Sequence, residues 1–181
     1  HNYINMFNLE KQDLKNQKVI IRVDFNVPLD DNFNVTDTTR IEACKETVDL
    51  IISNGGSCIL ISHFGRPKER EDKFSLKHIV ETVSEVLNHP VVFHNDCIGD
   101  EVQEVISNLK RGDIILLENL RFYKEETLGD SLFAEELSKL GDIYVNDAFG
   151  TCHREHSSIA LIAKHFKNKK FAGKLLQKEL E

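Results

Sequence analysis

The sequence has no tryptophan, one methionine, three prolines and only four cysteines among its 181 residues. Those cysteines, Cys44, Cys58, Cys97 and Cys152, lack the spacing of a zinc site or of a redox motif. A chain of this length can bury enough surface to fold without disulfides, so we interpret them as four reduced thiols. Reduced thiols are typical of cytosolic proteins, and we expect a cytoplasmic location.

Long apolar runs are also absent, since the longest contain five residues or fewer. A membrane-spanning helix needs roughly 20 apolar residues, so we expect no membrane partner. The N-terminal residues have neither the basic start nor the apolar stretch of a secretory signal.

Positive charge is not in excess, because the formal net charge is -7 at pH 7. Nucleic acid binding requires a basic face, so we expect no nucleic-acid partner. A small anionic ligand remains compatible with this charge, because a few arginines in one cleft create a local positive field.

Hydrophobic residues make up 40% of the chain and charged residues 29%, as in soluble globular domains. Short apolar segments predict strands at residues 19–23, 58–62, 91–93, 114–117 and 143–146. Their nearly continuous hydrophobicity indicates burial on both faces, which is typical of a parallel sheet.

Amphipathic segments between these strands predict helices. Thr39 and Glu42 have the spacing of a capping box at the start of one helix, which Gly55 and Gly56 would end. Ser75 is predicted to cap a second helix, and further helices are predicted near residues 102–109, 133–140 and 157–166. The alternation predicts a three-layer α/β/α, Rossmann-like domain with a mainly parallel sheet.

The C-terminal part of the chain is rich in lysine, with six between residues 164 and 178. Such a run is usually a solvated face, and we interpret it so. From residue 175 an amphipathic helix is predicted, without an obvious partner in this chain.

Polar and charged residues that could bind a ligand follow the predicted strands. Open parallel sheets bind their ligands at this position, beyond the carboxyl ends of the strands. Asp24 and Asn26 follow the first strand, His63 and Arg66 the second, Arg121 the fourth and Arg154 the fifth. Arg40 lies in the first turn of a predicted helix.

Four of the seven arginines are thus predicted at one edge. Arginine binds phosphate or carboxylate through a planar fork, and His63 can donate to either. The pattern predicts a small, multiply anionic ligand that carries a hydroxyl. Three alternatives stay open: a stand-alone phosphate- or carboxylate-binding module, a purely structural set of loops, and a phosphatase that uses Asp24 as nucleophile. The last would need a second carboxylate where Asn26 stands.

Several segments, taken in order, resemble the signatures of phosphoglycerate kinases. They are Arg22–Pro28 (RVDFNVP), Ser62–Pro67 (SHFGRP), Leu117–Phe122 (LENLRF), Val145–Arg154 (VNDAFGTCHR) with His156–Ser158, and the closing Ala172–Gly173 and Lys178–Leu180. The likeness runs from about residue 14 to the end and suggests about six strands.

The resemblance implies reversible phosphoryl transfer between 1,3-bisphosphoglycerate and ADP, giving 3-phosphoglycerate and ATP. It also assigns roles to individual residues: Asp24 and Asn26 would contact the glycerate, His63, Arg66, Arg121 and Arg154 would form a basic patch, and Arg40 would stabilise the moving phosphoryl group.

The resemblance implies a domain organisation as well. Residues 1–170 would form the N-terminal substrate-binding domain, and residues 171–181 would begin the interdomain hinge. The C-terminal domain, which would bind Mg²⁺ with ADP or ATP, is absent from this chain, and no P-loop motif replaces it. We therefore expect no cofactor or metal site here, a monomer, and no activity from the chain alone.

Overall fold

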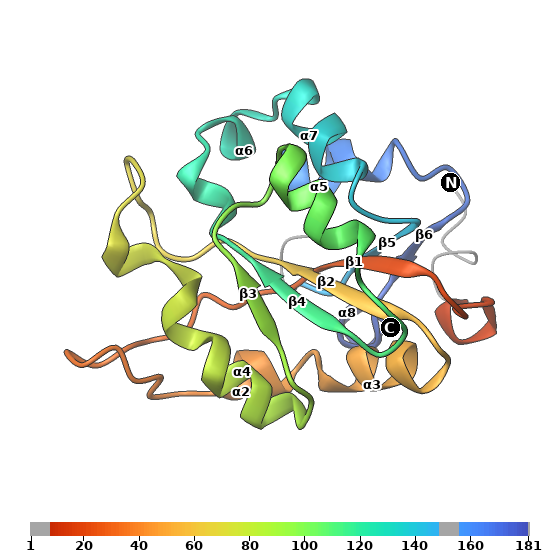
Figure 1. The fold of residues 1–181 in the computed structure, drawn as a ribbon, viewed down its shortest axis with the longest axis horizontal. Helices are drawn as coiled ribbons and strands as arrows, with labels where there is room; N and C mark the ends of the chain where they lie inside the picture. The colour runs from red at the N-terminus through yellow and green to blue at the C-terminus, as the bar shows by residue number, and fades with distance from the viewer. Residues whose placement is uncertain (1–7, 149–155, 181) are drawn as a thin grey trace.

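The computed structural model describes residues 8–148 and 156–180, and within them six parallel strands form one sheet in the order β3-β4-β2-β1-β5-β6 (Figure 1). The strands are β1 (Lys18–Arg22), β2 (Ser57–Ile61), β3 (Val92–His94), β4 (Ile114–Leu117), β5 (Ile143–Asn146) and β6 (Lys170–Ala172). The strands run the same way, so their carboxyl ends share one edge of the sheet.

Helices cover both faces of this sheet (Figure 1). The α-helices are α2 (Thr39–Glu42), α3 (Lys45–Ser53), α4 (Val80–Leu87), α5 (Asp100–Ser107), α6 (Glu125–Leu128), α7 (Ser131–Ser138) and α8 (Lys174–Leu180). The 3-10 helices are η1 (Leu9–Lys11), η2 (Asp72–Phe74), η3 (Leu76–Ile79) and η4 (Leu120–Phe122), and η5 (Ser157–Leu161) is a π-helix. No helix in the described ranges has the length and hydropathy to cross a membrane.

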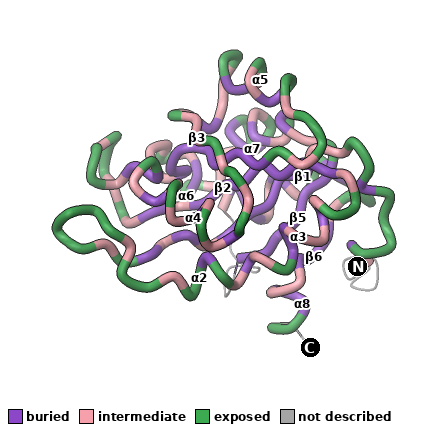
Figure 2. Tube along the Cα trace, turned by 60° about the horizontal axis from the view of Figure 1, so that its bottom comes forward, coloured by how far each residue is buried: buried purple, intermediate pink, exposed green. Residues whose placement is uncertain are grey.

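The core consists of two apolar clusters, one on each face of the sheet. Ile21 packs with α2, α3 and α4, whereas the neighbouring Ile20 packs with α5 and α7. Successive side chains of a strand point to opposite faces, so a strand covered on both sides must be apolar at every position. Figure 2 shows the buried residues concentrated along the strands and the exposed ones in the loops. The predicted fold class is confirmed.

Five strands lie where the apolar runs predict them, but β6 was missed. Lys170–Ala172 falls in the lysine-rich stretch that we interpreted as a solvated face, and for this segment that interpretation is wrong. Phe171 and Ala172 are buried, and the strand pairs with β5. Its three residues are too few to show a pattern among the lysines.

The predicted helix that starts at Thr39 is two helices, α2 and α3, with a break at residues 43–44. Thr38, not Thr39, is the N-cap, and its hydroxyl donates to the Glu42 carboxylate over 3.1 Å. Ser75 caps η3 as predicted, because its hydroxyl accepts from the Lys77 amide.

The C-terminal helix α8 has a partner in the chain, so the prediction of none was wrong. It packs against α3, and Leu176 is fully buried. The Lys174 amide donates to the Thr47 hydroxyl over 2.8 Å, and the Leu176 amide donates to Asp147 over 3.2 Å. These bonds satisfy amides in the first turn of the helix, where no intrahelical acceptor exists.

Asp147 follows β5 and is nearly inaccessible to solvent. The close approach of the chain explains Gly173, because a Cβ there would lie 2.3 Å from the Asp147 side chain. Burial raises the Asp147 pKa from 3.8 to about 6, although hydrogen bonds from Thr47, Leu176 and Leu175 act in the opposite direction.

This raised pKa predicts a pH-dependent effect of Asp147→Asn. The native state holds the Asp147 proton more tightly than the unfolded chain, so stability from this group is fully present below pH 3.8 and is lost as pH rises through about 6. Asparagine keeps the oxygen acceptor but does not titrate. We therefore expect the unfolding free energy of the variant, measured by urea titration, to rise relative to that of the parent chain between pH 4 and pH 7, by up to about 3 kcal/mol.

Asp147→Ala is the matched control, since it removes the acceptor together with the charge and should be less stable than Asp147→Asn at both pH values. A difference between the parent and Asp147→Asn that stays constant from pH 4 to pH 7 would contradict this account.

Candidate functional site

The loops after β1 and β2 are joined side by side at the carboxyl edge of the sheet. The Asn26 side-chain oxygen accepts from the Gly65 amide over 2.8 Å. The Ser62 hydroxyl accepts from the Phe25 amide over 2.9 Å and donates to the His63 carbonyl over 2.8 Å. The predicted convergence of these two loops is therefore confirmed.

Asn119 connects the loop after β4 to the same junction. Its side chain is fully buried, and its oxygen accepts from the amides of Phe64 and Arg121, each over 3.0 Å. Its amide group donates to the carbonyls of Phe64 and Phe74 over 2.7 and 3.0 Å. One neutral side chain thus holds three segments together and fixes the backbone from which Arg121 extends.

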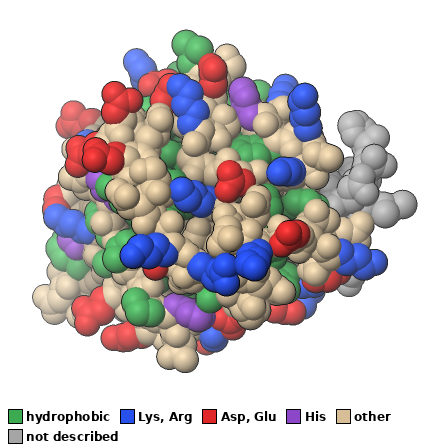
Figure 3. Space-filling view, turned by 45° about the vertical axis from the view of Figure 1, so that its right-hand side comes forward, with side chains coloured by type: hydrophobic (Ala, Val, Ile, Leu, Met, Phe, Trp, Pro, Cys, Tyr) green, Lys and Arg blue, Asp and Glu red, His purple; other side chains and the backbone are tan. Residues whose placement is uncertain are grey.

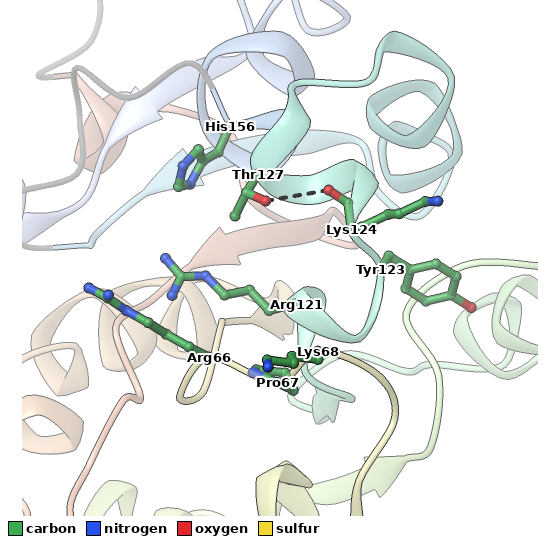
Figure 4. Close-up of a pocket in the computed structure, with 8 residues that line it drawn as sticks. All are labelled: Arg66, Pro67, Lys68, Arg121, Tyr123, Lys124, Thr127 and His156. Carbon is green, nitrogen blue, oxygen red and sulfur yellow. Dashed lines mark hydrogen bonds between the residues drawn. The ribbon is translucent and has the colours of Figure 1, made fainter.

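Arg121 and Arg66 line a cavity of about 580 Å³ (Figure 4). The other lining residues are Pro67, Lys68, Tyr123, Lys124, Thr127 and His156. In the close-up, the two guanidinium groups and the His156 ring lie on the same side, whereas Lys124 and Tyr123 extend the opposite way. Arg121 also donates to the Gly65 carbonyl over 3.2 Å, while Arg66 is exposed.

Arg40 lies against the loop after β1. Its guanidinium donates to the Asn26 carbonyl over 2.7 Å and contacts the Asp24 carboxylate at the longer distance of 3.4 Å. The Arg40 side chain is 52% exposed, so solvent and a ligand can reach its guanidinium group beside this loop.

His63 contacts a buried arginine that the sequence analysis did not single out as a site residue. Its Nδ1 lies 3.0 Å from the Arg22 guanidinium, and Arg22 is 1% exposed. The structure thus links Asp24, Asn26 and Arg40 to one another, and links Asn26 through Gly65 to Arg121. Arg154, the remaining predicted site residue, lies outside the described residues.

The rim of the cavity includes residues that the sequence analysis missed, namely Lys68, Tyr123, Lys124 and Thr127. Burial, followed by a 2.7 Å hydrogen bond to Asp96, raises the pKa of the Tyr123 phenol well above its usual value, so the phenol remains a donor. Tyr123, Lys124 and Thr127 lie in or beside the short helices η4 and α6, where position after a strand gives no signal, whereas Lys68 lies in the loop after β2, two residues beyond Arg66.

Acidic and basic side chains are interspersed on the face that Figure 3 presents, so the charge of that face does not by itself mark a site. Nor does a metal-ligand set identify it: in residues 8–148 and 156–180 no three His, Cys, Asp or Glu side chains gather to hold an ion. What distinguishes the cleft is the hydrogen-bonded framework that holds its arginines.

The fold and this cleft define a Rossmann-like α/β domain with basic side chains at the carboxyl edge of a parallel sheet. Comparison with known proteins is more specific. The family model described as phosphoglycerate kinase matches residues 9–181, and the chain belongs to this family.

Similar proteins span a wide range of organisms. Cytosolic phosphoglycerate kinase 3 of Arabidopsis thaliana is 51% identical over 173 residues, which are 96% of this chain and 43% of that protein. Phosphoglycerate kinase of Aquifex aeolicus is 47% identical over 172 residues, 95% of this chain and 43% of that protein. The chain therefore spans less than half the length of these relatives.

A solved structure of the same family also matches the chain over less than half of its own length. The crystal structure of phosphoglycerate kinase from Pyrococcus horikoshii OT3 matches with a TM-score of 0.87 and 32% identity, covering 97% of this chain and 44% of that one. The chain matches the N-terminal part of the family.

The framework around Asn119 predicts a large cost for Asn119→Ala. The substitution would leave the Phe64 amide and carbonyl without their partner in a buried site, so we expect a loss of about 3 kcal/mol in unfolding free energy, measured by urea titration. Asn95→Ala is the control, because Asn95 is exposed and lies outside the helices and strands, so its substitution should change stability by less than about 0.5 kcal/mol. Equal effects of the two substitutions would refute the framework.

Proposed function

We propose that the chain is the substrate-binding domain of a phosphoglycerate kinase and holds 3-phosphoglycerate or 1,3-bisphosphoglycerate in the carboxyl-edge cleft. The whole enzyme would transfer a phosphoryl group reversibly between 1,3-bisphosphoglycerate and ADP, giving 3-phosphoglycerate and ATP. The observation that carries the proposal is the pair of guanidinium groups, Arg66 and Arg121, lying together in a cavity attached to the Asp24–Asn26 loop.

The arginines would bind the anionic groups of the substrate. Arg66 and Arg121 each present a planar fork that matches two phosphate or carboxylate oxygens. The Gly65 carbonyl, which accepts a hydrogen bond from Arg121, is a neutral group and carries no charge to the site. His63 and Arg154 complete the proposed basic patch.

The loop after β1 would orient the glycerate itself. The Asn26 oxygen is engaged by the Gly65 amide, so the Nδ2 group is the part of this side chain that would donate to the substrate. The Asp24 carboxylate would accept from the glycerate hydroxyl. Fixing the acceptor in this way supplies the alignment that phosphoryl transfer requires.

Arg40 is the proposed catalytic residue. Its 3.4 Å contact with Asp24 is long for a charged hydrogen bond, and its side chain is half exposed. On turning toward a transferring phosphoryl group it would exchange this contact and its 2.7 Å hydrogen bond to the Asn26 carbonyl for the developing charge, which an arginine stabilises.

Mg²⁺ with ADP or ATP would bind outside this chain. The described residues do not assemble a metal-ligand set. We propose that residues 1–170 form the substrate domain, that residues 171–181 begin the hinge to a nucleotide-binding domain, and that the chain alone transfers nothing. We also propose a monomer in the cytoplasm. One matched relative is described as cytosolic, which supports this location, and another is described as chloroplastic.

The test is calorimetric titration of the chain with 3-phosphoglycerate at low salt. We expect saturable binding that Arg66→Ala weakens at least about tenfold, because a charge-assisted hydrogen bond is worth about 1.5–3 kcal/mol. Arg66→Lys keeps the positive charge but loses the planar guanidinium fork, so its affinity should lie between those of the parent chain and Arg66→Ala. Arg66 is exposed, and neither substitution should affect folding.

Arg111→Ala is the matched control. Arg111 lines a separate pocket with Lys18 and Ser57, the first residues of β1 and β2, so it lies at the opposite edge of the sheet. Its removal should change affinity less than twofold. A folded parent chain that does not bind, or equal losses from both arginine-to-alanine variants, would contradict the proposed site.

A further inference from the structure

A buried charged network lies beneath the proposed cleft and is not accounted for by substrate binding. Its members are Arg22 at the end of β1, Glu126 in α6 and Ser158 in η5, which are 1%, 0% and 0% exposed. Removing two charges from water is costly, and such a pair persists only where its hydrogen bonds are well satisfied. Because burying these two charges is costly, we expect the network to have a structural or a functional role.

The hydrogen bonds of this network have a fixed direction. Arg22 Nε donates to the Ser158 hydroxyl over 3.0 Å, because a guanidinium can only donate. The Ser158 hydroxyl donates its one hydrogen to Glu126 Oε2, and the Ser158 amide donates to Glu126 Oε1 over 2.8 Å. The carboxylate thus reaches Arg22 through Ser158 rather than by direct contact.

The indirect link leaves the terminal nitrogens of Arg22 for other partners. One donates to the Val23 carbonyl, and the other lies 3.0 Å from His63 Nδ1. An arginine has no acceptor and stays protonated in proteins, so His63 Nδ1 must supply a lone pair at this contact. The neutral ring then carries its proton on Nε2.

We infer that Arg22 is a positioning residue that fixes His63 as the Nε2–H tautomer and so makes it a hydrogen-bond donor to the substrate. The inference rests on the proposed function, because it specifies the state in which His63 meets a phosphate or carboxylate oxygen. The partner of one ring nitrogen decides which role the other plays. Ser158 and Glu126 hold the guanidinium in the orientation that this requires.

A purely structural role would not need the histidine. The Arg22–Ser158–Glu126 chain is already complete as a charge-balanced unit, and its contact with His63 adds a bond that only one tautomer can make. If the role of Arg22 is purely structural, the tautomer of His63 should not change when Arg22 is replaced. If Arg22 positions His63, the tautomer should change.

The ring state can be measured directly by long-range ¹H–¹⁵N NMR of the histidine side chains at about pH 8.5, where an unperturbed imidazole is neutral. In the parent chain we expect His63 Nδ1 to show a pyridine-like shift and Nε2 a pyrrole-like shift. His78 is an internal reference, because its Nε2 faces the Asp72 carbonyl over 2.9 Å. A protonated Nδ1 in His63 would overturn the inference without any variant.

Arg22→Met then tests the cause, with Arg111→Met as the control that removes the same charge at the opposite edge. We expect Arg22→Met to give His63 a mixture of both tautomers, to leave His78 unchanged and to weaken 3-phosphoglycerate binding about tenfold. Arg111→Met should change neither. An unchanged His63 spectrum in Arg22→Met would overturn the inference, and if that variant does not fold, the parent spectrum decides.

The two proposals fail separately. If the parent chain does not bind 3-phosphoglycerate, the proposed function fails, while the His63 spectrum still shows whether Arg22 sets the tautomer. If binding is intact but His63 carries its proton on Nδ1, the proposed function stands and the role of Arg22 is rejected.

Discussion

The cleft depends on one constraint: cationic side chains must be brought together at the carboxyl edge of the sheet without being neutralised by the residues that hold them. A parallel sheet provides the edge, since every strand delivers its following loop to the same side. Neutral side-chain amides provide the hydrogen bonds that join the loops. Asn119 and Asn26 fix the loops that carry Arg66 and Arg121 through hydrogen bonds to backbone groups, so these bonds take no charge from the guanidinium groups.

A neutral group also separates opposite charges in the buried layer below the cleft. Arg22 is buried, and its carboxylate partner Glu126 acts through the hydroxyl of Ser158. A direct ion pair would occupy the guanidinium, whereas the relay leaves a terminal nitrogen for His63. The residues proposed to touch the substrate and the buried residues that orient them thus form successive layers, in which the buried layer sets the geometry of the outer one.

Sequence reasoning recovered the fold where a simple periodicity existed and failed where it did not. The apolar run of β4 marked a buried strand, but Lys170–Ala172 could not be recognised as β6 because its three residues are too few to show a pattern among the neighbouring lysines. For the site, position after a strand predicted Asp24 and Arg121. Arg22 was missed, although a charge inside an apolar strand was a signal, because its meaning depends on Glu126, which lies 104 positions away in sequence and becomes a neighbour only on folding.

The most direct test of the cleft is to map binding onto the backbone, by following amide resonances of the isotope-labelled chain as 3-phosphoglycerate is added. The account predicts saturable shifts centred on Gly65, Arg66 and Arg121, with Lys18 and Arg111 at the opposite edge unaffected. Shifts centred on the opposite edge, or spread over the lysine-rich surface without saturation, would contradict the central claim that this edge of the sheet is the substrate site.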